Sequence, residues 1–181
     1  MALTLSGSGA INGLTLPTDS LQPGAVLVAS QSFSGASSVS INNCFTSTYQ
    51  NYLIHWSITP SGSTDIAYRM RAAGVDASGT GTYAFTYIYA NNTTASATAG
   101  VAAYGPTDNT ASGSRLVSMT MMNPALVANT DVLTLWYTKG ASGGFCGTQH
   151  ATALAYDGIS VFPGAGGTIT GNIRIYGMRN S

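Results

Sequence analysis

The chain has 181 residues and a formal net charge of zero, and only 7% of its residues are charged, against roughly 25% in an average soluble domain. All six acidic residues are Asp and Lys139 is the single lysine, so the polar residues that favour exposed helices are nearly absent. Gly, Ser, Thr and Asn separate runs rich in Tyr, Val and Ile, which is typical of an all-β protein with many turns. The absence of a basic patch argues against nucleic-acid binding.

The first 24 residues differ from the rest of the chain. Aliphatic residues are separated by Ser, Gly, Asn and Thr, and Pro17 and Pro23 interrupt any regular element. We predict an extended attachment arm over residues 1–24 and a β-sandwich domain over residues 25–181. The arm would hold a partner through five aliphatic side chains: Leu3, Leu5, Ile11, Leu14 and Leu16.

From residue 25 onward, apolar and polar residues alternate in short runs bounded by Gly, Pro and Ser, which predicts strands. The predicted strands before the C-terminal part cover residues 25–33, 38–45, 53–59, 65–73, 82–90, 114–122, 131–139 and 147–156. Residues 91–114 are small and polar and predict a long loop, with a short strand near 101–104, that would be an exposed recognition surface.

The C-terminal part alternates Ile159, Val161, Ile173 and Ile175 with polar residues across a glycine-rich link. This predicts two strands that belong to the core, because a frayed terminal strand would leave backbone groups unpaired. With no helical pattern between the strands, the fold class is all-β. We predict an antiparallel β-sandwich or jelly roll of about eight or nine strands.

Several of these segments resemble a known family. Tyr49–Ile54, followed by a polar turn and Ala67–Arg71 with Gly74, resembles the β-sandwich module of bacteriophage tail fibres and other virion fibres. Gly171–Asn180 resembles the end of such modules, and Ser8–Leu14 resembles phage fibre N-termini. The resemblance implies a non-enzymatic structural protein of the virion: a short tail or baseplate fibre of a tailed phage, commonly a homotrimer, anchored by its N-terminal part and contacting the host surface.

Two other functions fit the same pattern. A capsid decoration, cement or head-fibre protein would lay the arm across capsomer seams. A polysaccharide depolymerase would need two carboxylates facing one bond, whereas each Asp outside the arm stands at a strand start or in a turn. The expected partners are further copies of the chain, other tail, baseplate or capsid proteins and a host surface glycan.

We expect no catalytic, cofactor or metal site. Residues 140–144 satisfy the G-x-S-x-G pattern of hydrolases, but no helical segment follows the serine as that motif requires. His55 and His150 are the only histidines, and no local pair of ligands suggests zinc. No run approaches the roughly 20 apolar residues that span a membrane, and the start lacks the basic residues of a secretory signal. We therefore expect synthesis in the host cytoplasm and free, buried thiols at Cys44 and Cys146, with a disulfide as the alternative.

Aromatic residues alternate along one predicted strand. Tyr83, Phe85, Tyr87 and Tyr89 share a face, and Tyr104 follows in the next segment. This row could be a core face with its hydroxyls at the rim, a subunit interface, or a glycan-binding face. The candidate contact residues are Tyr83, Tyr87, Tyr89 and Tyr104.

Overall fold

The computed structural model describes residues 24–91, 94–108, 111–140 and 142–178, and in these residues all regular structure is β-strand. In chain order the strands are β1 (Ala25–Ala36), β2 (Val39–Ile41), β3 (Asn51–Pro60), β4 (Ile66–Ala72), β5 (Val75–Asp76), β6 (Tyr83–Asn91), β7 (Thr94–Ala102), β8 (Gly105–Pro106), β9 (Arg115–Met122), β10 (Thr130–Thr138), β11 (Ser142–His150), β12 (Gly158–Pro163) and β13 (Ile169–Met178). The predicted arm, with Leu3, Leu5, Ile11, Leu14 and Leu16, lies outside the described residues.

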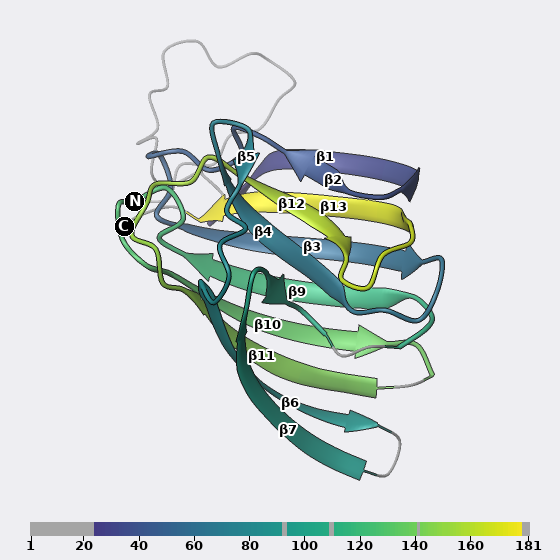
Figure 1. The fold of residues 1–181 in the computed structure, drawn as a ribbon. Coiled ribbons are helices and arrows are strands. Elements are labelled where there is room, and N and C mark those ends of the chain that lie inside the picture. The colour runs from purple at the N-terminus through teal and green to yellow at the C-terminus, as the bar shows by residue number, and fades with distance from the viewer. Residues whose placement is uncertain (1–23, 92–93, 109–110, 141, 179–181) are drawn as a thin grey trace, which may run out of the picture.

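The strands form two antiparallel sheets that pack as a β-sandwich, which confirms the predicted fold class (Figure 1). The large sheet has eight strands in the order β1-β13-β3-β9-β10-β11-β6-β7. The small sheet has five strands: β2-β12-β4-β5, with β8 paired to β4. The terminal strand β13 pairs with both β1 and β3, so the prediction that the C-terminal strand belongs to the core is confirmed.

The core lies between the sheets and follows from the alternation along the strands. In β3, Tyr52, Ile54, Trp56 and Ile58 are buried, whereas the intervening His55 is exposed. This is the period of two that gives a strand one buried face. From the small sheet, β4 and β12 supply buried Ile, Tyr, Met and Val side chains to the same cluster. Each such side chain contributes about 1.5–3 kcal/mol when it is fully buried.

The two layers have unequal width. The small sheet covers the part of the large sheet around β13 and β3, while the β6–β7 hairpin extends past it (Figure 1). The short strand β8 contacts β6 and β11 and so reaches from the small sheet toward this hairpin. Gly105 makes this position possible, because a Cβ there would lie 2.2 Å from the Tyr68 ring.

The predicted loop over residues 91–114 is wrong for most of its length. Residues 94–102 form β7, which pairs with β6 from Asn91↔Thr94 to Tyr83↔Ala102, and residues 105–106 form β8. The segment looks polar because Thr, Ser, Ala and Gly dominate it, but such small side chains still complete a ladder beside an aromatic strand. Two predicted strands also had wrong bounds: residues 38–45 shrink to β2, and residues 147–156 become β11, which begins at Ser142 and ends at His150.

Candidate functional site

The aromatic row of β6 lies on the inner face of the large sheet, the face toward the small sheet. The Phe85 and Tyr87 rings are stacked, with centroids 5.6 Å apart and planes 7° apart. The Tyr89 ring lies 5.6 Å from Tyr87 and 6.3 Å from Trp136 of β10. Gly144 of β11 lies between Tyr89 and Trp136. A Cβ at this position would lie 2.8 Å from Tyr89 and 3.0 Å from Trp136, so only glycine fits there without displacing them. The row is therefore continuous across three strands.

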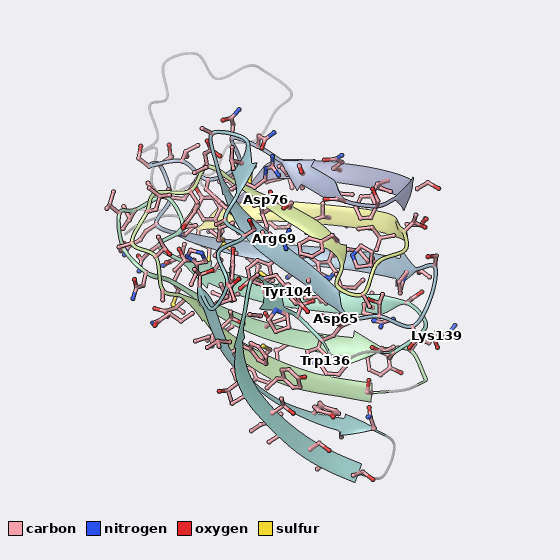
Figure 2. All side chains as sticks on the ribbon, in the orientation of Figure 1. Asp65, Arg69, Asp76, Tyr104, Trp136 and Lys139 are labelled. Atoms are coloured by element: carbon pink, nitrogen blue, oxygen red, sulfur yellow. The ribbon has the colours of Figure 1, made fainter. Side chains whose placement is uncertain are left out.

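A groove of about 370 Å³ opens beside this row, and we call it the aromatic groove. It is within the usual size range of small-ligand sites. Its lining residues are Asp65, Phe85, Tyr87, Val101, Ala102, Tyr104, Pro106 and Asp108. Figure 2 labels Asp65, at the start of β4, and Tyr104, just before β8. The groove thus lies where the small sheet ends and the β6–β7 hairpin continues.

Asp65 supplies the accessible charge of the groove. Burial raises the pKa of its carboxyl, partly opposed by a hydrogen bond from Thr64 and by the charge of Arg115. Burial also raises the pKa values of Tyr87 and Tyr104, and the Asp65 carboxylate adds to both shifts. The carboxylate and the two tyrosines line the same groove, so one ligand could contact all three.

Asp108, the second carboxylate of the groove, is buried and hydrogen-bonded within the fold. Its side chain is 0% exposed and accepts a hydrogen bond of 2.6 Å from Arg115 Nε, whose side chain is also 0% exposed. The Ile66 amide donates to the same carboxylate at 2.7 Å. Burial raises the pKa of Asp108 to about 7, against the lowering effect of Arg115 and the Ile66 amide. Asp65 is therefore the groove carboxylate that a ligand can reach more readily.

Arg115 fastens three segments together. Its guanidinium donates to Asp108, to the carbonyls of Thr64 at 2.5 Å and Ala111 at 2.7 Å, and to the Gly113 carbonyl at 2.5 Å. These contacts tie β9 to the start of β4 and to the segment after β8. The rigid wall of the aromatic groove depends on this buried cation.

The outer face of the large sheet, which points away from the small sheet, is unusually apolar. Six large apolar side chains there are 40–61% exposed, and we call them the outer patch: Ile88, Leu116, Leu133, Leu135, Tyr137 and Phe145. The strand register places Leu135 opposite Phe145 and Phe145 opposite Ile88, so these three form one row across β10, β11 and β6. A hollow of about 490 Å³ on this side is lined in part by Leu116, Leu135 and Tyr137.

The predicted contact residues have different environments. Tyr83 is 0% exposed, and its hydroxyl accepts from the Met70 amide at 2.9 Å and donates to the Ala77 carbonyl at 3.0 Å. Its use as a surface contact is therefore wrong, because the core satisfies both the ring and the hydroxyl. Tyr87, Tyr89 and Tyr104 are half-buried. The groove brings Tyr87 and Tyr104 together, and Tyr89 lies farther along the row.

Sequence reasoning missed both the groove carboxylate and the outer patch. Asp65 was interpreted as a residue at a strand start, and Phe85 only as part of the row. The alternation in β10 does contain a signal, since Leu133, Leu135 and Tyr137 share one face and Thr130, Thr134 and Thr138 share the other. Because Val132 and Trp136 lie on the threonine face, both faces carry large apolar side chains, and the alternation alone does not show which face is buried.

The other groups considered from the sequence are the two thiols, the G-x-S-x-G serine and possible metal ligands. Cys44 and Cys146 are free and buried, and burial raises the pKa of the Cys44 thiol to about 12. Ser142 of the G-x-S-x-G pattern lies on strand β11 and is not followed by a helix. Among the described residues no group of three His, Cys or Asp side chains is placed to hold a metal ion. The same residues contain no helix of the length and apolarity needed to cross a membrane.

In comparisons with known proteins, no family model and no curated protein matches the chain.

Proposed function

We propose that the chain is a non-enzymatic structural subunit of a virion, a short fibre or fibre-like appendage of a tailed phage that assembles through the outer patch. The virion context comes from the sequence resemblance in residues 8–14, 49–54, 67–74 and 171–180. One structural observation supports assembly: the exposed apolar outer face of β10.

In β10 the inner face mixes buried threonines with the core residues Val132 and Trp136, whereas the outer face exposes large apolar side chains. Thr130, Thr134 and Thr138 are 0% exposed, and their hydroxyls have no hydrogen-bond partner among the described residues. On the other face, Leu135 is 61% exposed and Tyr137 is 53% exposed. A shift of one residue in register would exchange the two faces. That shift would also expose Val132 and Trp136, so the observed register keeps these two residues in the core. The leucine face that it leaves in solvent would be buried by contact with another subunit.

The chemistry of the outer face suits a second copy of the same sheet. Around the outer patch the neighbouring positions of β6 and β7 are Ala84, Ala90, Ala95, Ala97 and Ala99, and those of β11 are Gly143 and Gly147. Small residues between rows of large ones let two sheets approach to the roughly 10 Å of sheet packing. The chain carries no net charge to oppose this contact.

The energy available is of the right size. The outer-patch side chains are about half-exposed, so burying the remainder of six of them gives roughly 4–9 kcal/mol per subunit before the costs of association. Three subunits with these faces around a common axis would form the trimer that the resemblance implies. The arm over residues 1–24 would then attach the trimer to the particle.

Light scattering on the full chain tests the assembly. We expect a mass of three times the 18.5 kDa chain. Leu135→Asp places a charge in the middle of the outer patch and should return the protein to a monomer. Val75→Asp is the matched control, because Val75 is 69% exposed but lies on β5 of the small sheet. A monomeric parent protein, or equal effects of the two substitutions, would refute assembly through this face.

Particle fractionation tests the placement. Removing residues 1–24 should abolish incorporation into virions while leaving the trimer intact. Recovery with purified tails supports the fibre or baseplate position, whereas recovery with purified heads would replace it by a decoration protein. Normal incorporation of the truncated chain would contradict the anchoring role of the arm.

A further inference from the structure

The aromatic groove holds a carboxylate that lacks an ionic partner in the described residues. The ion pairs there join Arg69 and Arg71 to Asp76, and Arg115 to Asp108. Arg115 lowers the pKa of Asp65 from a distance, but the Arg115 hydrogen bonds go to Asp108 and to backbone carbonyls. Asp65 is therefore the groove carboxylate that forms no ion pair in the described residues.

The Asp65 carboxylate has a hydrogen bond with its own backbone amide, and the side-chain hydrogen bond that it receives is weak. Thr64 Oγ1 lies 3.5 Å from Asp65 Oδ1 but only 3.0 Å from the Asp65 main-chain oxygen. A hydroxyl has one proton, and the shorter contact holds it more firmly. A partly desolvated carboxylate without an ion pair gains from a bound cation.

The groove presents mainly acceptors and aromatic rings. The Asp65 carboxylate is an acceptor only, and the Tyr87 and Tyr104 oxygens can accept as well. Phe85, Tyr87 and Tyr104 add ring electrons, which attract cations. A sugar carries as many acceptors as donors and would need several donors from the protein, and the side chains that line the groove offer only the two tyrosine hydroxyls.

We propose that the aromatic groove binds a primary alkylammonium group, with the Asp65 carboxylate as its counter-ion and Tyr87 and Tyr104 as flanking acceptors. An ammonium group has three donors and no acceptor, which matches this lining. Two sources carry this chemistry: a free polyamine and a lysine side chain of a protein. The site lies on the inner side of the large sheet, so it does not depend on the assembly proposed above.

Isothermal titration calorimetry on the full chain at low ionic strength tests the proposal. The probes are 1,4-diaminobutane and Nα-acetyl-lysine N-methylamide, with N-acetyl-norleucine N-methylamide as the matched uncharged control. Both amines should bind and the norleucine derivative should not, and added salt should weaken binding. If the lysine derivative binds more tightly than the diamine, the natural ligand is a lysine side chain of a protein. The reverse order indicates a free polyamine.

Substitutions at two carboxylates supply the control. Asp65→Asn keeps the shape and removes the charge, and it should weaken both amines by at least about tenfold, as expected for loss of a charge-assisted pair. Asp131→Asn alters an exposed carboxylate that accepts from Gln149 at 2.8 Å in another part of the molecule, and it should change nothing. Tyr87→Phe keeps the ring and should weaken binding less, so it tests the groove if Asp65→Asn disturbs folding.

Three results would overturn the assignment. Equal binding of the norleucine and lysine derivatives would show that the groove does not recognise the ammonium charge. Undiminished amine binding by Asp65→Asn would place the amine elsewhere. Binding of methyl α-glucoside, with no amine bound, would make the groove a saccharide site. Because assembly is measured by mass and this site by titration, either proposal can fail while the other stands.

Discussion

Replacing Arg115 by Met should destabilise the sandwich severely. Arg115 and Asp108 are both 0% exposed at the side chain, so the substitution leaves a buried carboxylate without its cation. It also removes the donors to the Thr64, Ala111 and Gly113 carbonyls. Breaking one partner of a buried pair costs about 3–5 kcal/mol. For a chain of this length, that corresponds to a fall in Tm of roughly 6–20 °C.

Urea unfolding followed by tryptophan fluorescence measures this loss, because Trp56 and Trp136 are both in the core. All variants must be compared at one chain concentration, since assembly contributes to apparent stability. The double variant Arg115→Met with Asp108→Leu removes the stranded charge and should recover a substantial part of the loss. Two results would refute the reasoning: a loss below about 1 kcal/mol for Arg115→Met, or a double variant whose loss relative to the parent protein equals the sum of the losses of Arg115→Met and Asp108→Leu.

Two further predictions follow from buried titratable groups. His150 is 1% exposed, and burial lowers its pKa, so as the pH falls the unfolded chain takes up the proton before the folded chain does. The free energy of unfolding should therefore fall as the pH drops from about 6.5 toward the lowered pKa of the folded state. In urea titrations, His150→Gln should remove this acid-dependent step, whereas His55→Gln, at an exposed position, should retain it. Cys44 and Cys146 are buried and free. Neither thiol should react with a thiol reagent in the native protein, and both should react in urea. Fast reaction of either thiol without denaturant would contradict its burial.

The parts of the fold that the sequence predicts well are those in which one face is plainly apolar. β3 alternates Tyr52, Ile54, Trp56 and Ile58 with smaller or polar residues, and β13 alternates Ile173 and Ile175 in the same way, so the pattern alone assigns their buried faces. β7 fails this test because Ala, Thr and Gly give little contrast between its faces. Its strand conformation depends on pairing with β6, a tertiary interaction that local propensity does not contain.

The candidate site was foreseen only in its aromatic part. Tyr87 and Tyr104 were named from composition and alternation, but their meeting with Asp65 requires the start of β4 and the segment before β8 to lie together. No local pattern shows that proximity. The same limit applies to Arg115 and Asp108, because residues seven positions apart become an ion pair only when the chain between them folds back over β4.

The unequal width of the two sheets links the two proposals. The small sheet leaves the inner side of the β6–β7 hairpin uncovered, and this opening creates the aromatic groove (Figure 1). A hairpin with one open face is marginally stable unless its other face is buried. The outer patch includes Ile88 of this hairpin and Phe145 of the adjoining strand β11, so assembly would support the strands that the small sheet does not cover. The same strands would thus hold subunits together on one face and remain free on the other to form a ligand site.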